Sequence, residues 1–241
     1  MDTLDSTFPT PAENLACDEA LLDWREQLGG EEILRFWESP EPFVVVGYAN
    51  KVATEVNTAA CEAKKIPIFR RCSGGGTVLQ GKGCLNYALI LRVAEDLPTG
   101  NISTANRFIM ERNCAAIQSL LGDRQLASIR GCTDLAINGI KFSGNSQRRR
   151  KHYLLFHGTF LLNFDLALIS ELLRMPSKQP DYRNSRRHDE FLTNLNLSTA
   201  EVKAALQKNW EAISLLKNPP LEKISALARE KYATREWNFK F

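Results

Sequence analysis

The chain has 241 residues, of which 44% are hydrophobic and 24% are charged, and its formal net charge is +3. This length and composition are typical of one globular domain with a sizeable core, so we predict a single domain over residues 1–241. The small net charge argues against a nucleic-acid-binding protein. No apolar run approaches the roughly 18 to 20 residues needed to cross a bilayer, which argues against a membrane partner.

The first half of the chain alternates between helical and strand patterns. Apolar spacing predicts helices over 11–27 and 57–65, and runs of β-branched and aromatic residues predict strands over 33–38, 43–48 and 66–69. A stretch with three consecutive glycines follows at 70–78. Because the next apolar run also has strand character, we expect this glycine loop to connect two strands.

The second half begins with a predicted helix over 101–121. Asn138-Gly139 between alternating runs predicts a hairpin over 134–144, and 154–162 predicts another strand. Helical patterns then cover 166–173, 199–215 and 219–232. Strands that are grouped and followed by helices predict an α+β domain.

The glycine loop favours a bound anion. Glycine permits positive φ and close approach to the backbone, and successive N–H groups in such a turn can bind phosphate or carboxylate. Arg70 and Arg71 before the loop add bidentate donors. A P-loop is excluded, because Gly83 stands where that motif requires Ser or Thr. The alternative is a glycine hairpin with surface charges beside it.

Two blocks in this order resemble the lipoate-protein ligase A family of the biotin/lipoate protein ligase superfamily. The first combines 70–78 with Gly83-x-x-Asn86, and the second combines 134–135, 139–147 and 157–163. The resemblance covers roughly residues 10–200. It implies a mixed β-sheet flanked by helices, similar to class II aminoacyl-tRNA synthetases and biotin ligases. We expect no separate C-terminal accessory domain of the kind that the long ligases carry. Either the activity runs without that domain, or a second polypeptide supplies it, or the reaction differs.

The resemblance implies a ligase that activates lipoate with ATP and Mg²⁺ to lipoyl-AMP. The lipoyl group then passes to a lysine of a lipoyl-domain protein, such as a 2-oxoacid dehydrogenase E2 or a glycine cleavage H protein. Activating a carboxylate with ATP brings two anions together, and fixed cations offset their repulsion. We predict no metal-ligating residues: Asp134 near the phosphates could hold Mg²⁺, but Asp at the entrance to a strand is more often a turn residue.

Lys141 in the second block is the predicted catalytic residue, since the family lysine contacts the acyl carboxylate and the adenylate phosphate. The alternative for Lys141 is a solvent-facing strand lysine. The predicted substrate- and nucleotide-binding residues are Arg70, Arg71, Ser73, Gly74, Gly75, Gly76, Asn86, Asp134, His157, Gly158 and Thr159. For most of these a purely structural role remains open, as it does for the expected acyl-tunnel residues Val46, Val78, Phe142 and Leu161.

Six cysteines, at positions 17, 61, 72, 84, 114 and 132, form no Cys-x-x-Cys pair. Their scatter argues against a zinc site. The first residues lack the basic segment and apolar run of a secretory signal, so we expect reduced thiols and a cytoplasmic protein.

The cysteines also support an alternative function. Octanoyltransferases of the same superfamily pass an octanoyl group from acyl carrier protein to the same lysine through a cysteine thioester, without ATP. Cys132 is the candidate nucleophile, with Cys72 a distant second, and an inert thiol is the alternative for both. A non-catalytic lipoate-binding protein is a third possibility. The family's Tyr-His-Asp after the glycine loop is replaced here by Leu79-Gln80-Gly81.

Basic residues concentrate at 147–152 and 183–188. Such runs are usually solvated faces, but they could also attract an acidic lipoyl domain and raise its encounter rate.

Overall fold

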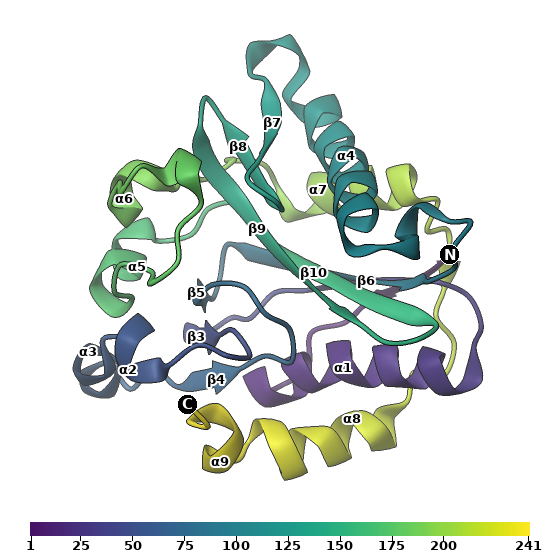
Figure 1. Cartoon of the computed structure of the whole chain (residues 1–241), viewed down its shortest axis with the longest axis horizontal. Helices are drawn as coiled ribbons and strands as arrows, with labels where there is room; N and C mark the ends of the chain where they lie inside the picture. The colour runs from purple at the N-terminus through teal and green to yellow at the C-terminus, as the bar shows by residue number, and fades with distance from the viewer.

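The structure is a computed structural model and describes residues 1–123 and 125–241. It contains a mixed eight-stranded sheet with the order β11-β1-β2-β6-β10-β9-β8-β7 and a three-stranded sheet with the order β4-β3-β5. Helices cover both faces of the larger sheet (Figure 1). The predicted α+β class, with a mixed sheet flanked by helices, is therefore confirmed.

The strands are β1 (Asp2–Asp5), β2 (Ile33–Trp37), β3 (Phe43–Val46), β4 (Ile68–Arg70), β5 (Val78–Gln80), β6 (Cys84–Arg92), β7 (Ala127–Arg130), β8 (Asp134–Ile137), β9 (Ile140–Arg149), β10 (Tyr153–Leu161) and β11 (Ser214–Leu215). The α-helices are α1 (Pro11–Leu28), α2 (Val52–Glu55), α3 (Thr58–Ala63), α4 (Ile102–Leu121), α5 (Leu166–Leu172), α6 (His188–Phe191), α7 (Thr199–Trp210), α8 (Leu221–Leu227) and α9 (Arg235–Asn238). Short helical turns are η1 (Pro98–Gly100), η3 (Asp181–Arg183) and η4 (Ala228–Tyr232).

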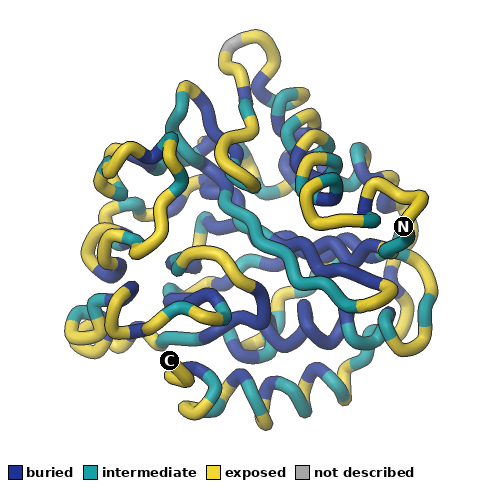
Figure 2. The backbone as a smooth tube through the Cα atoms, in the orientation of Figure 1, coloured by how far each residue is buried: buried dark blue, intermediate teal, exposed yellow. Residues whose placement is uncertain are grey.

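The two faces of the large sheet have separate hydrophobic cores. Side chains alternate across a strand, so Leu34 and Phe36 of β2 pack with α4 and α7, while Ile33 and Trp37 pack with α1 and α8. The central strands are buried in Figure 2, whereas β9 is half-buried along most of its length. One side of β9 is therefore open to a pocket.

The small sheet presents the glycine loop. Strands β4 and β5 both pair with β3, in parallel and antiparallel directions respectively. The connection between them is residues 71–77, so the loop links two strands as predicted. Val44 and Val46 of β3 are buried in a third core together with α5.

The predicted hairpin is β8–β9. Its turn residues Asn138 and Gly139 have φ angles of 52° and 75°, the positive values that a two-residue turn between twisted strands requires. Strand β9 also pairs antiparallel with β10, which places the hairpin beside the sheet centre.

The predicted helix over 199–215 is too long. It ends at Trp210 because Glu211 adopts a left-handed conformation with φ 53°, and Ser214–Leu215 then pair with β1. The short strands β1 and β7 were not predicted. None of the helices formed by the described residues has the length and apolar character needed to span a membrane.

Candidate active site

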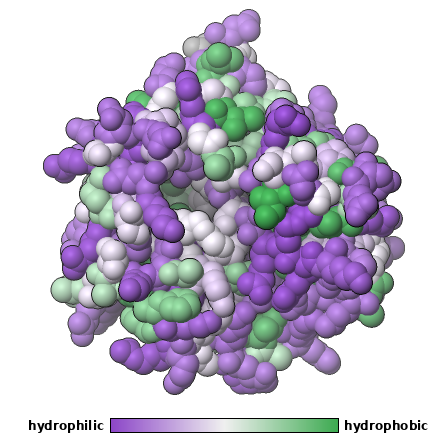
Figure 3. Space-filling view, viewed as in Figure 1, coloured by the Kyte–Doolittle hydropathy of each residue, from purple (hydrophilic) through white to green (hydrophobic). Residues whose placement is uncertain are grey.

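A pocket of about 360 Å³ lies between the glycine loop and the β8–β9 hairpin. The face drawn in Figure 3 is hollowed near its centre and is mostly hydrophilic around the hollow. Of the predicted site residues, the pocket wall includes Arg71, Gly75, Gly76, Asn86, Asp134, Lys141, His157, Gly158 and Thr159. The fold thus gathers both sequence blocks around one cavity.

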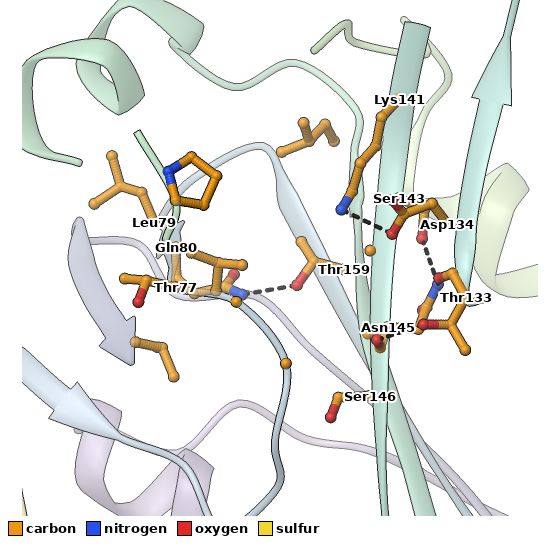
Figure 4. Close-up of a pocket in the computed structure, with 18 of the residues that line it drawn as sticks. Thr77, Leu79, Gln80, Thr133, Asp134, Lys141, Ser143, Asn145, Ser146 and Thr159 are labelled. Carbon is orange, nitrogen blue, oxygen red and sulfur yellow. Dashed lines mark hydrogen bonds and ion pairs between the residues drawn. The ribbon is translucent and has the colours of Figure 1, made fainter. Parts of the chain in front are cut away.

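Lys141 extends from the start of β9 into this pocket (Figure 4). Its Nζ lies 2.8 Å from Oδ1 of Asp134, and the two side chains are 24% and 14% exposed. The other carboxylate oxygen of Asp134 accepts a 2.8 Å hydrogen bond from the Tyr182 hydroxyl. Burial, and next the charge of Asp134, raise the pKa of Tyr182, so its hydroxyl stays protonated and donates. Asp134 therefore fixes the lysine ammonium at the pocket wall.

Gly144 makes room for this lysine. A Cβ atom at Gly144 would lie 2.7 Å from Nζ and 2.8 Å from Cε of Lys141. The lysine side chain therefore folds back across β9, over the position where another residue would have its side chain. Gly144 was not predicted as a site residue, although it lies within the second sequence block.

The glycine loop turns its carbonyl groups toward the protein. Arg71 donates from Nη2 to the carbonyls of Gly74 and Gly76, at 2.5 and 2.7 Å. Asn50 donates to the carbonyl of Gly75 at 3.2 Å. Within the described part of the chain, the amide nitrogens of Gly74, Gly75 and Gly76 have no hydrogen-bond acceptor. Free amides beside a pocket suit a bound anion or a developing oxyanion.

Ser73 connects this loop to a buried chain of contacts, the relay, which runs through His157 and Asp18 to Arg35. Its Oγ accepts a 3.1 Å hydrogen bond from Arg71 Nε and lies 2.6 Å from His157 Nε2. His157 Nδ1 lies 2.9 Å from Asp18, whose other oxygen lies 2.5 Å from Arg35. Because Arg71 can only donate, the serine proton is available to His157, and Nδ1–H then donates to Asp18. Ser73 is only 1% exposed, so this arrangement anchors the loop and does not present a serine nucleophile to substrate.

Arg70 makes different contacts from Arg71. It is fully buried, and its guanidinium donates to the carbonyls of Gly47, Tyr48, Asn50, Trp237 and Asn238. All three guanidinium nitrogens therefore donate to main-chain carbonyls, and Arg70 is not part of the pocket wall. This geometry corrects the expectation that Arg70 contacts substrate.

Asn86 and Thr159 face each other on β6 and β10 and form part of the pocket floor. Thr159 Oγ1 donates to Asn86 Oδ1 at 2.7 Å and accepts from Gln80 Nε2 at 2.7 Å. Gln80 was mentioned only as a departure from the family motif, yet it lines the pocket. The expected apolar tunnel is partly present: Val78 and Leu161 line the cavity, whereas Val46 and Phe142 lie in the core.

Cys132 lies in the turn between β7 and β8 and lines the same pocket as Lys141. Among the cysteines of the described chain, Cys132 alone is exposed. Cys72, the second candidate, is buried behind the glycine loop, and burial raises the pKa of its thiol to about 12. A thiolate nucleophile must be accessible and ionised. Cys132 therefore remains a candidate nucleophile, and Cys72 does not.

Most arginines of the two basic runs contact other parts of this chain. Arg148 and Arg149 donate to main-chain carbonyls, and Arg150 pairs with Asp23. Arg183 and Arg186 likewise donate to carbonyl groups. These contacts weaken the expectation that the runs form a surface for an acidic partner.

No group of three or more His, Cys, Asp or Glu side chains in the described residues is placed to hold a metal ion.

The family model of the lipoyl protein ligase A/B catalytic domain matches residues 10–211. A curated relative, octanoyltransferase LipM of Geobacillus kaustophilus, is 28% identical, with 98% of this chain and 97% of the relative covered. Octanoyltransferase LipM of Bacillus subtilis is 27% identical, with the same coverage of the two chains.

Two solved structures are similar over nearly their whole length. An archaeal bipartite lipoate protein ligase from Thermoplasma acidophilum, described with its E2 lipoyl domain, has a TM-score of 0.79 and 26% identity, and 99% of this chain and 96% of that chain are covered. A lipoate-protein ligase A bound with ATP has a TM-score of 0.78 and 27% identity, and 99% of each chain is covered.

The curated relatives correct one expectation from the sequence. An ATP-dependent ligase that forms lipoyl-AMP was the main reading of the motifs, but relatives that match over almost the full chain are octanoyltransferases. The requirement for ATP and Mg²⁺ was tied to that reading and is withdrawn with it. The motifs could not separate the two activities, because one family model covers the catalytic domains of both the A and the B type.

Proposed function

Because the chain belongs to the lipoyl protein ligase A/B catalytic domain family, we propose that it is an octanoyltransferase acting through a Cys132 thioester. It takes octanoyl from acyl carrier protein and passes it to a lysine of a lipoyl-domain protein. The LipM relatives support the reaction class. The observation that carries the proposal is the exposed Cys132 in the pocket that Lys141 enters.

In the first step the Cys132 thiolate attacks the carbonyl carbon of the carrier thioester. A new C–S bond forms, the bond to the carrier sulfur breaks, and the carrier thiol leaves with a proton equivalent to the one that Cys132 gave up. In the second step the neutral ε-amine of the target lysine attacks the Cys132 thioester. An amide forms, and the amine proton is transferred to the departing cysteine sulfur. The enzyme is regenerated without any energy source besides the thioester.

Both steps pass through a tetrahedral intermediate with negative charge on the former carbonyl oxygen. The Lys141 ammonium and the free amides of Gly75 and Gly76 line the same pocket as Cys132. Fixed donors and cations of this kind stabilise a developing oxyanion because they need no reorganisation during the reaction. Lys141 is thus assigned to charge stabilisation, with Asp134 holding it in place.

Neighbouring structures support the substrate and partner classes. One similar structure from Thermoplasma acidophilum contains bound lipoic acid, an eight-carbon acid like the proposed octanoyl group. Another is described together with its E2 lipoyl domain. We therefore assign lipoyl-domain proteins as acceptors, of the E2 or H-protein type. Unpaired cysteines in the structure fit a reducing cytoplasm.

The test is transfer from octanoyl-acyl carrier protein to a purified lipoyl domain, without ATP, followed by intact-protein mass spectrometry. We expect an octanoyl adduct on the wild-type enzyme that disappears when the lipoyl domain is added. Cys132→Ser should abolish both the thioester and the transfer. Cys114→Ser is the matched control, since Cys114 lies on α4 outside the pocket wall, and it should retain both. Transfer that needs ATP and survives Cys132→Ser would refute the proposal.

A further inference from the structure

A chain of hydrogen bonds runs from the core of the large sheet to the turn that carries Cys132. Trp210 Nε1 donates to Asn113 Oδ1 at 2.8 Å, and Asn113 Nδ2 donates to the Tyr87 hydroxyl oxygen at 2.7 Å. The Tyr87 hydroxyl donates to Asn145 Oδ1 at 2.6 Å. Asn145 Nδ2 donates to the Thr133 carbonyl at 2.7 Å. The chain therefore ends on the residue directly after Cys132.

The direction of this chain is determined by its first member. An indole N–H can only donate, so Asn113 must present its oxygen to Trp210 and its amide nitrogen to Tyr87. The tyrosine proton is then free for Asn145, whose nitrogen is left for Thr133. Trp210, Asn113 and Tyr87 are 5%, 0% and 0% exposed, so water does not compete for these groups. A buried polar chain in which every member is satisfied has one arrangement.

Asn145 makes two hydrogen bonds with Thr133 in this turn. In addition to its side-chain donation, its main-chain carbonyl accepts a 2.8 Å hydrogen bond from Thr133 Oγ1. Figure 4 shows the Thr133 and Asn145 side chains together at the edge of the pocket. Across the sheet, Gly158 leaves the space that Asn145 needs: a Cβ there would lie 1.6 Å from Asn145 Oδ1.

We propose that Tyr87 and Asn145 are positioning residues for the catalytic turn. Through Thr133 they fix the main chain that carries Cys132 on one side and Asp134, the partner of Lys141, on the other. The positions of the Cys132 thiol and the Lys141 ammonium are thereby fixed by one buried chain of hydrogen bonds and not by the turn alone. The consequence for catalysis rests on the proposed thioester function, whereas the fixed turn follows from the hydrogen bonds alone.

The kinetic test is Tyr87→Phe, which removes the hydroxyl but keeps the ring that stacks on Phe160. Displacing a reacting group by about 1 Å can cost on the order of 100-fold in rate. We expect octanoylation of Cys132 to slow by about 10- to 100-fold, with little change in the KM for the carrier. Tyr153→Phe is the matched control, because it removes a buried hydroxyl that donates to Gly30. This control should keep the wild-type rate, and equal losses in the two variants would overturn the inference.

A second readout does not depend on the reaction. A trifluoromethyl thiol reagent should label the exposed Cys132 selectively, and its ¹⁹F spectrum reports how uniform the turn is. We expect one narrow resonance for the wild type and for Tyr153→Phe, and broad or multiple resonances for Tyr87→Phe. A single narrow resonance at the wild-type position in Tyr87→Phe would overturn the inference.

A third variant covers the case in which Tyr87→Phe does not fold. Thr133 is half-buried, and Thr133→Val removes the hydrogen bond that Thr133 Oγ1 donates to the Asn145 carbonyl. We expect this variant to broaden the ¹⁹F resonance, with little change in thermal unfolding. An unchanged resonance in Thr133→Val would then count against the inference. Failure of the wild type to form an octanoyl-Cys132 adduct would refute the proposed function, while the label spectra would still decide the positioning role.

Discussion

The two walls of the pocket are held in different ways. The glycine loop is fixed from behind by charged groups: Arg71 binds its carbonyls, and Ser73, His157 and Asp18 lead back to Arg35. The turn at 131–133 is held by neutral hydrogen bonds, through Asn145 and Tyr87. The loop contributes main-chain amides to the pocket, whereas the turn and the start of β8 contribute the side chains of Cys132 and Asp134.

This difference separates two tasks. A backbone that must receive charge in a fixed geometry benefits from buried groups that hold it in place, since preorganised donors need no reorganisation during the reaction. A nucleophile has to be reached by two large partners in turn, and the exposed turn allows this. We therefore expect changes behind the loop to appear mainly in stability, and changes around the turn to appear mainly in rate.

The largest expected effect lies behind the loop. Asp18→Asn leaves the fully buried Arg35 without its anionic partner and weakens the acceptor for His157. Breaking a buried ion pair costs about 3–5 kcal/mol, so the free energy of unfolding should fall by that amount in denaturant titrations. Asp189→Asn is the control, because its pair with Arg187 is exposed and should be worth at most about 1 kcal/mol. Equal losses in both variants would show that the relay does not support the loop.

The next largest effect is expected for Lys141, in the pocket wall opposite the glycine loop. Lys141→Met removes the ammonium at the pocket wall while keeping a flexible chain of similar shape. Loss of one oxyanion-stabilising group typically lowers kcat by about 10²–10³-fold, and we expect this fall in single-turnover transfer to the lipoyl domain. The unfolding midpoint should change little because Lys141 is partly exposed. A rate within a few-fold of the wild type would remove Lys141 from the mechanism.

A smaller effect is expected for Gly144→Ala. The added methyl group meets the end of a flexible side chain, so the lysine moves and the backbone does not have to. We expect transfer to slow by about tenfold, since small misplacements of a reacting group are costly. The double variant with Lys141→Met provides the control. If Gly144 acts through the lysine, the second change should cause no further loss, and additive losses would contradict this role.

Much of the architecture could be predicted from the sequence. The Asn138-Gly139 hairpin and the glycine loop between two strands follow from local conformational preferences, which tertiary contacts here reinforce. The short strands β1 and β7 were missed because four residues carry little periodic signal, and their pairing is decided by distant partners. The end of α7 at Trp210 was missed for a similar reason, since a left-handed Glu211 has no sequence signature.

Several of the predicted site residues line one pocket, but their individual contacts could not be predicted. Adjacent arginines look alike in a motif, but Arg70 contacts the main chain after β3 and in α9, whereas Arg71 lines the pocket. Asn145, Gly144 and Tyr87 were not singled out, because their importance depends on what lies across the strand. The two candidate cysteines could be ranked only from the structure, because Cys132 is exposed and Cys72 is buried.

The side chain of Arg70 has a consequence for how the molecule assembles. It joins the strand before the glycine loop to Trp237 and Asn238, about 167 positions downstream. Contacts between such remote parts of a polypeptide form late, because a long loop must close first. A ribosome-bound chain that has already emerged as far as β10 would still lack this anchor. The strand before the glycine loop is therefore expected to gain this support only after synthesis has passed α9.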